Sequence, residues 1–194
     1  MRSRITALLT AGLLLLFGAL MTAGPASAGQ EATTAGFTAQ ARAAGLSASQ
    51  ADALQEKVKR YLDTMGGKQV APDRIQLDGG MVYLTVPGEK NPRDLAAEAG
   101  AAPYYNPCAG GGADYKHMCA YRSTNFSGDT VDMYTCKRYY FSTWGGRGSW
   151  DNNQTTGTVA RMYNPSGSLI YRTPPAHSWD ANGSWDPVRS IVNC

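Results

Sequence analysis

The sequence predicts an all-β domain over residues 108–194, preceded by a small α/β unit and by a leader that is removed from the mature protein. Three observations support this division. All four tryptophans and most of the tyrosines follow residue 108, where short apolar runs alternate with glycine-rich turns and no helical periodicity appears. A helical repeat of apolar residues is confined to residues 51–65. A basic and then apolar stretch opens the chain.

Residues 1–28 have the three parts of a secretory signal peptide. Arg2 and Arg4 precede an apolar run over residues 8–20, and small residues ending at Ala28 provide a cleavage site. The alternative, a membrane-spanning anchor, needs about 20 apolar residues, whereas this run is shorter and contains glycines. We therefore expect cleavage after Ala28, secretion to the extracellular space and no membrane association of the mature protein.

The charge of the mature chain argues against nucleic acid as a partner. The whole chain has 18 Lys and Arg residues against 15 Asp and Glu residues. The leader takes away Arg2 and Arg4 and no acid, so 18 minus 2 leaves 16 basic residues against 15 acidic ones. A nearly neutral chain lacks the basic stripe on which nucleic-acid binding usually rests.

The composition also argues against an enzyme. The only histidines are His117 and His177, and no Glu follows Glu98. No pattern assembles a nucleophile, a base and an oxyanion hole, or three metal ligands with an open position. His117 adjoins a cysteine that is expected to be oxidised, and His177 lies in a loop with no acid pair nearby, so both are expected to have structural or surface roles. We expect no catalytic residue and no required cofactor.

The first half of the mature chain is predicted to contain one long helix. Residues 29–44 are rich in Ala, Thr and Gln and are expected to form a flexible entry segment. Ser47 and Gln50 have the spacing of a capping box, and Gly66 follows the last apolar residue as a stop signal. The apolar residues that share one helical face are Ala51, Leu54, Val58, Tyr61, Leu62 and Met65.

A β-hairpin is predicted next, over residues 75–86, with its turn at residues 78–80. A short helix within residues 92–99 and a linker at residues 101–107 complete the predicted segment. Residues 29–107 are thus expected to be a flexible segment, a small helix-plus-hairpin unit and a linker. One hypothesis makes them a pro-region that assists export or folding of the β domain.

The β domain is predicted to have two disulfides and several short strands. An even number of cysteines in an exported protein indicates disulfides, and four cysteines allow three pairings. Pairing of Cys108 with Cys119 and of Cys136 with Cys194 is favoured, because three glycines at residues 110–112 make the first loop easy to close. The predicted strands are 118–122, 130–134, 158–163, 169–172 and 190–194, in a sandwich or a barrel.

Tyr121, Phe126 and Gly128 form the pattern Tyr-x-x-x-x-Phe-x-Gly. This pattern resembles the folded hairpin of the βγ-crystallin superfamily, in which the glycine adopts a conformation closed to other residues and two aromatic rings pack on the hairpin. Residues 151–156 resemble the loop that follows the hairpin in that superfamily, and residues 163–168 and 185–190 resemble a weaker second repeat. The resemblance covers residues 108–194 and implies a Greek-key sandwich.

The resemblance also implies a calcium site. Asp151, Asn152 and Thr155 would supply oxygen ligands from the first loop, whereas Pro187 stands where the second loop should offer a side-chain oxygen. At most one weakly bound calcium ion is therefore expected. The alternative is a turn in which Asp151 and Asn152 bind local backbone groups and Thr155 hydrogen-bonds across to the hairpin.

Secreted bacterial members of the superfamily include small metalloproteinase inhibitors and killer-toxin-like proteins, and the leader and cysteine positions are similar to theirs. The resemblance implies a secreted, monomeric proteinase inhibitor that presents a rigid loop of a disulfide-linked β domain to an extracellular protease. The alternative is an extracellular structural or carbohydrate-binding module, in which exposed tryptophans stack on sugars.

Overall fold

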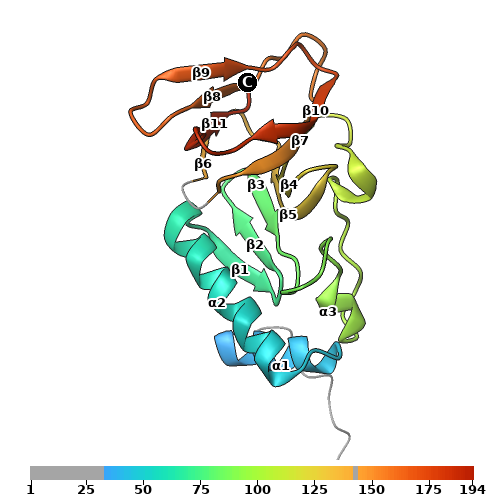
Figure 1. The fold of residues 1–194 in the computed structure, drawn as a ribbon. Helices are drawn as coiled ribbons and strands as arrows, with labels where there is room; N and C mark the ends of the chain where they lie inside the picture. The colour runs from blue at the N-terminus through green and yellow to red at the C-terminus, as the bar shows by residue number, and fades with distance from the viewer. Residues whose placement is uncertain (1–32, 142–143) are drawn as a thin grey trace, which may run out of the picture. The chain divides into compact units, whose positions relative to one another are not determined.

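The computed structural model describes residues 33–141 and 144–194, which belong to one structural unit (Figure 1). The predicted signal peptide, residues 1–28, lies outside the described residues. The fold is mostly β, with one antiparallel sheet of seven strands, a second of four strands and a few short helices. None of the described helices combines the length and the apolar character needed to cross a membrane.

The described helices are α1 (Thr34–Ala43), α2 (Ala48–Met65), α3 (Leu95–Glu98) and the 3-10 turn η1 (Ala109–Gly111). The strands of the large sheet are β1 (Lys68–Ala71), β2 (Arg74–Leu77), β3 (Gly80–Tyr83), β4 (His117–Ser123), β5 (Ser127–Met133), β7 (Arg147–Asn153) and β10 (Ser178–Ser184). The strands of the small sheet are β6 (Arg138–Tyr140), β8 (Arg161–Tyr163), β9 (Leu169–Arg172) and β11 (Ser190–Val192).

The long helix confirms the prediction from the capping pattern. The Ser47 hydroxyl accepts a hydrogen bond from the Gln50 N–H, and the Gln50 side chain accepts one from the Ser47 N–H. The prediction of a flexible segment at residues 29–44 was wrong for residues 34–43, because they form α1. Phe37 and Ala41 lie four residues apart, and both are buried on one side of this helix. Two buried side chains are enough to hold α1, although its composition is that of a loop.

The large sheet has the strand order β1-β2-β3-β5-β4-β7-β10, and the small sheet has the order β6-β11-β8-β9. The β2–β3 hairpin and the short helix α3 lie where the sequence predicts them. Four strands were not predicted: β1, β6, β7 and β10. Strands β7 and β10 are rich in Asp, Asn, Ser and Gly, which strand propensities disfavour, and long-range pairing with β4 and with each other overrides those propensities.

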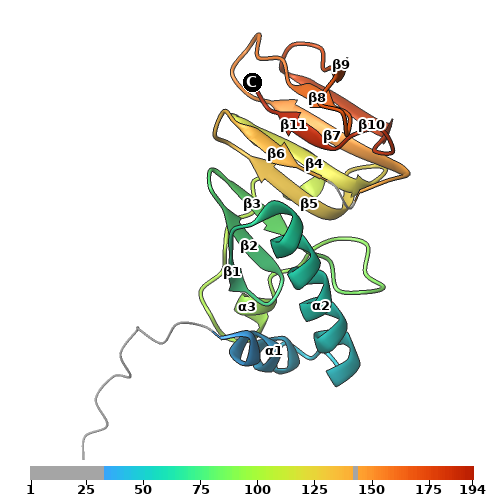
Figure 2. The same cartoon turned by 90° about the vertical axis from the view of Figure 1, so that its left-hand side faces the viewer.

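The inner face of the large sheet carries the core. Ile75, Val82, Val131, Ala120 and Trp150 lie opposite one another in register from β2 to β7, so their side chains project from the same face. Helix α2 contacts β1 and β2, and the small sheet lies as a second layer in the upper part of Figure 2. Buried residues of α2, of the large sheet and of the small sheet form one continuous apolar cluster.

The two halves predicted from the sequence share this sheet. Strand β3 of the first half pairs with β5 of the second half through four residue pairs, from Gly80 opposite Met133 to Tyr83 opposite Thr130. A boundary at residue 107 therefore does not separate two cores. The linker expected at residues 101–107 contains no helix or strand and runs from α3 to the Cys108 turn.

Both disulfides have the pairing that the sequence favours. Cys108 is bonded to Cys119 and Cys136 to Cys194, with Cα–Cα separations of 5.7 and 5.4 Å. The first disulfide ties the segment before β4 to the outer face of the large sheet. The second ties the chain end after β11 to the segment before β6.

Candidate functional site

The outer face of the large sheet collects most of the chemically distinctive side chains. Asp132, Cys119 and Asp151 lie opposite one another on β5, β4 and β7, so their side chains project from the same face. This face is opposite to the one that carries the core, yet Asp132 is only 2% exposed and Asp151 only 5% exposed. The segment that leads to β4 covers them, because its cysteine is bonded to Cys119.

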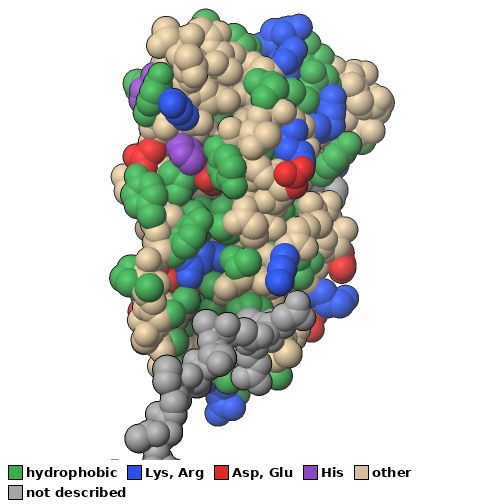
Figure 3. Space-filling view, turned by 180° about the vertical axis from the view of Figure 1, so that it is seen from behind, with side chains coloured by type: hydrophobic (Ala, Val, Ile, Leu, Met, Phe, Trp, Pro, Cys, Tyr) green, Lys and Arg blue, Asp and Glu red, His purple; other side chains and the backbone are tan. Residues whose placement is uncertain are grey.

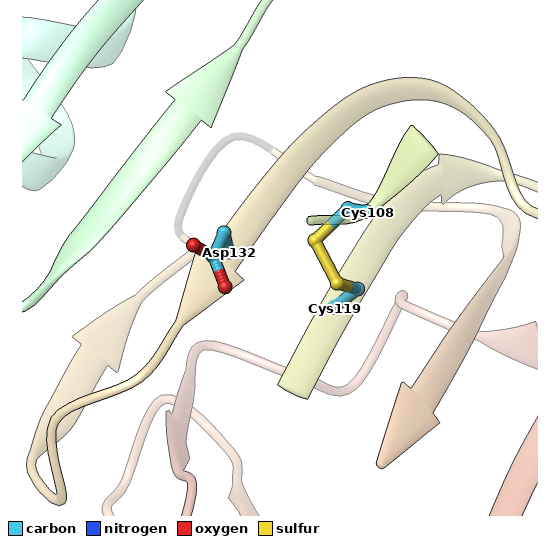
Figure 4. Close-up of side chains that lie close together, drawn as sticks. All are labelled: Cys108, Cys119 and Asp132. Atoms are coloured by element: carbon cyan, nitrogen blue, oxygen red, sulfur yellow. A yellow bond between two sulfur atoms is a disulfide. The ribbon is translucent and has the colours of Figure 1, made fainter. Parts of the chain in front are cut away.

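Cys108, Cys119 and Asp132 form the one group of three potential metal-ligating residues found in the described part of the chain (Figure 4). The two sulfur atoms are bonded to each other, so neither is a thiolate that could bind a metal ion. Burial raises the pKa of Asp132, and a hydrogen bond from His117 opposes this shift. The cluster is a covalent support for the outer face and not a metal centre.

Both histidines bind buried carboxylates. His117 Nδ1 lies 2.7 Å from Asp132 Oδ1, and His177 Nε2 lies 2.9 Å from Asp151 Oδ1. Figure 3 shows both histidines, in purple, on one face of the molecule among hydrophobic side chains. The partner of His177 is not visible in the surrounding sequence, because Asp151 is 26 residues away in the chain and comes close through the pairing of β10 with β7.

A groove lies beside His117 on the outer face, and we call it the tyrosine groove. It has a volume of about 540 Å³. Its lining residues are Tyr83, Tyr104, Tyr105, Pro107, Lys116, His117, Asp132 and Tyr134. Tyr105 is 71% exposed, and Tyr104 and Tyr134 are each about half exposed, so several large side chains here are free to contact a partner.

Specific interactions hold the tyrosines of the groove in place. The Tyr104 ring lies over the Arg74 guanidinium, with 4.7 Å between Arg74 Cζ and the ring centroid. The backbone N–H of Tyr104 donates to Asp94 Oδ2 at 2.7 Å. The Tyr105 hydroxyl donates to Asp114. Although burial alone would raise the pKa of Asp94, the Tyr104 and Ala97 N–H groups and Arg74 lower it. The carboxylate that anchors this segment is thus stabilised in its charged form.

Tyr121, Phe126 and Gly128 lie in the hairpin formed by β4 and β5. The Tyr121 and Phe126 rings are 5.6 Å apart at 78°, and Gly128 has φ of +87°, which is unfavourable for other residues. Asn125 also has a positive φ. The side chain that ties the hairpin to the sheet is Ser149, which donates to Ser123 O and accepts from the Phe126 N–H.

The three residues proposed for calcium are not brought together by their side chains. Asp151 and Asn152 are consecutive residues of β7, so they project from opposite faces of the sheet. Asp151 binds His177 and the Ala113 N–H, whereas the Asn152 amide donates to Thr158 O and Thr173 Oγ1. Thr155 is exposed in the loop beyond the strand. The prediction that a loop begins at residue 151 was wrong, because strand β7 continues to Asn153.

The tryptophans are mostly core residues. Trp144, Trp150 and Trp185 are each at most 3% exposed, and only Trp179 is strongly exposed, at 60%. Of these tryptophans, Trp179 alone is therefore exposed enough to stack on a sugar as the carbohydrate-binding alternative requires. Their number in the sequence reflects packing between the two sheets, where the rings of Trp144 and Trp185 meet at 5.3 Å.

Comparison of the chain with protein-family models, with curated proteins and with solved structures found no match. The fold and the site define the class of protein as a mostly β, disulfide-linked chain with an aromatic groove on one sheet face. Sequence reasoning missed the groove because its lining residues come from four separated segments, two of which were predicted to be linker or hairpin.

Proposed function

We propose that this chain is a secreted proteinase inhibitor, directed at metalloproteinases, and that it docks on its target through the tyrosine groove. The observation that supports this function is the set of exposed tyrosines on a firmly held surface. Tyrosine is enriched in protein interfaces, because it offers a large contact area and loses little conformational entropy when it is immobilised. The resemblance to βγ-crystallin-like inhibitors suggests the class of target.

The support beneath the groove favours tight binding. The Cys108–Cys119 disulfide closes a loop that includes Tyr115 and Lys116, and the Lys116 ammonium lies 5.9 Å from the centroid of the Tyr115 ring. Asp114, in the same loop, accepts a hydrogen bond from the Tyr105 hydroxyl. A surface fixed before binding loses less ordering entropy on docking, which increases affinity. The loop closed by this disulfide is the rigid loop that we assign to the inhibitor.

We infer a βγ-crystallin-like Greek-key sandwich for residues 108–194, supported by the ring pair of Tyr121 and Phe126 and by the positive φ of Gly128. The protein would act by binding, as a monomer in the extracellular space, without a required cofactor.

Inhibition assays test the proposal. The mature chain, residues 29–194, should be assayed against thermolysin-like, serine and cysteine proteases, with pre-incubation and with excess protease as a control for digestion of the inhibitor. We expect inhibition of the thermolysin-like class. Absence of inhibition in all three classes would contradict the inhibitor function, and inhibition of a different class would contradict the metalloproteinase assignment.

A pair of variants tests the position of the docking surface. Tyr105→Ala removes an exposed tyrosine of the groove, whereas Tyr140→Ala removes a tyrosine of β6 that is 55% exposed and lies outside the groove. A central interface tyrosine contributes about 2 kcal/mol, so we expect Tyr105→Ala to weaken inhibition by roughly 10-fold or more and Tyr140→Ala to leave it unchanged. The reverse order would place the docking surface elsewhere.

A further inference from the structure

A second cavity, of about 250 Å³, lies at the open edge between the two sheets and shares no residue with the tyrosine groove. Strands β7 and β10 of the large sheet line one side, and β8 and β9 of the small sheet line the other. Its walls include the aromatic side chains of Trp150, Tyr171 and Trp185, and the rings of Trp150 and Tyr171 are 6.1 Å apart. The cavity is therefore mainly apolar, with three aromatic side chains in its walls, and we call it the edge cavity.

One carboxylate enters this mainly apolar cavity. Asp180 lies opposite Trp150 in the pairing of β10 with β7, so its side chain points toward the side of the sheet that carries the core. Asp180 Oδ1 accepts a hydrogen bond from the Asn182 N–H at 2.8 Å. Within the described residues, the other carboxylate oxygen accepts no hydrogen bond and the Trp150 indole N–H donates none. Neither atom is fully buried, so both are open to solvent.

The free oxygen and the indole N–H converge on the same small space, which Gly183 leaves open. A Cβ atom at residue 183 would lie 3.2 Å from Asp180 Oδ2 and 3.8 Å from Trp150 Nε1. The φ of Gly183 is not in the left-handed region, so the backbone does not require glycine here. The absence of a side chain instead preserves a space that is bordered by one acceptor and one donor.

The chemistry of this space selects among ligand classes. A hydroxyl group both donates and accepts, so it can satisfy the carboxylate and the indole N–H together. An ammonium group only donates and would leave the indole N–H unpaired, and an anionic group would be repelled by Asp180. No Lys, Arg or His lines the edge cavity in the described part of the chain. Aromatic walls suit the apolar C–H face of a sugar ring.

We propose that the edge cavity binds a neutral sugar residue, with its hydroxyl groups on Asp180 and Trp150 and its ring against Tyr171. An inward-pointing carboxylate at an edge strand also discourages pairing with another strand. That role does not require the space beside Gly183, whereas a bound hydroxyl group does. The inference is independent of the proposed inhibitor function, because the two sites share no residue.

Titration with simple sugars tests this inference. The full mature chain would be titrated with the methyl glycosides of glucose, mannose and galactose and with N-acetylglucosamine, while the indole N–H resonances are followed by NMR. The Trp150 signal would be assigned with Trp150→Phe. We expect at least one neutral sugar to shift the Trp150 indole signal saturably and to leave the Trp144 signal in place.

Two comparison ligands and a pair of variants complete the test. Glucuronate and tetramethylammonium should not compete, and saturable binding of tetramethylammonium in place of the neutral sugars would show an aromatic cage for cations and overturn the proposal. Asp180→Asn is expected to weaken sugar binding about 10-fold or more, since hydrogen bonds to a charged group contribute strongly. Asp63→Asn, on the exposed side of α2, is the matched control and should not change it.

Gly183→Ala tests the space directly, because the added methyl group would occupy it. We expect loss of sugar binding with retained near-ultraviolet circular dichroism, and unchanged inhibition of the target protease. No shift of the Trp150 signal with any of the four sugars, or undiminished binding by both Asp180→Asn and Gly183→Ala, would overturn the proposal.

Discussion

Asp73 is a buried carboxyl group whose charge is poorly compensated. It is 1% exposed, and its Oδ1 atom has no hydrogen-bond partner. Arg74 Nε lies 3.8 Å away, but the Arg74 guanidinium is bonded more closely to Asp94, at 3.1 Å. Desolvation therefore dominates and raises the pKa of Asp73 from 3.8 to about 7.

This raised pKa predicts a pH-dependent stability. The folded state holds the Asp73 proton up to pH about 7, whereas the unfolded state loses it near 3.8, so stability falls as pH rises across this window and is level above it. Across this whole pH window, the free energy of unfolding falls by at most about 4 kcal/mol. Asp73→Asn has no proton to lose, so its stability relative to wild type should increase by about 2 to 3 kcal/mol between pH 5 and pH 8. Urea unfolding at several pH values measures this difference, and a constant difference would contradict it.

Gly128→Ala tests the hairpin at a single residue. The added Cβ would lie 2.8 Å from Ser123 Oγ and 3.1 Å from Ser123 N, in addition to the strain of a φ of +87°. The backbone strain alone is roughly 1 to 2 kcal/mol. Gly157 has a similar φ of +90° and open space around it, so Gly157→Ala is the control for strain without contact. Thermal unfolding should show a larger loss for Gly128→Ala, and equal losses would show that the contact with Ser123 is unimportant.

At the scale of elements, sequence patterns predicted those structures that depend on interactions between residues close together in the chain. The Ser47 capping box, the apolar face of α2 and the turn of the β2–β3 hairpin are all short-range patterns, and each is present. Strand β10 could not be predicted in this way, because its residues are mostly polar and its position depends on pairing with β7. The motif likeness over residues 151–156 likewise predicted a loop where pairing of β7 with β4 continues the strand to Asn153.

Ser149 gives the clearest test of how β7 supports the hairpin. It is fully buried, donates to Ser123 O at 2.7 Å and accepts from the Phe126 N–H at 2.8 Å. Ser149→Ala should destabilise the protein by about 1 to 2 kcal/mol, because a partly buried backbone N–H loses its partner. Ser166→Ala, in the exposed β8–β9 turn, should have little effect. Denaturant unfolding of both variants measures this, and equal stabilities would contradict the assigned role of Ser149.

At the scale of the whole molecule, the first half of the chain completes the sheet of the second half. Without residues 29–107, β5 would become an edge strand, and the inner face beneath α2 would be exposed. Residues 108–194 alone should therefore lack the cooperative unfolding transition of residues 29–194, or unfold at a much lower temperature. Differential scanning calorimetry compares the two chains. A fragment as stable as the mature chain would instead support removal of residues 29–107 as a pro-region.

The candidate sites depend on this long-range assembly, which explains why sequence reasoning missed them. Tyr83 comes from β3, Tyr104 from the segment after α3 and His117 from β4. Strand β5 pairs with both β3 and β4, and this pairing places the first and second halves of the chain side by side. Asp180 and Trp150 likewise meet only through the pairing of β10 with β7. No pattern within a single segment indicates that these residues lie close together in the fold.

The measurement that tests the docking surface most directly is hydrogen exchange of the mature chain, alone and in complex with the protease that it inhibits. We expect slower exchange on binding in residues 104–118 and 132–134, which border the tyrosine groove, and unchanged exchange in β8 and β9. Slower exchange confined to β8, β9 or β10, with residues 104–118 unaffected, would contradict the assignment of the outer face as the inhibitory surface.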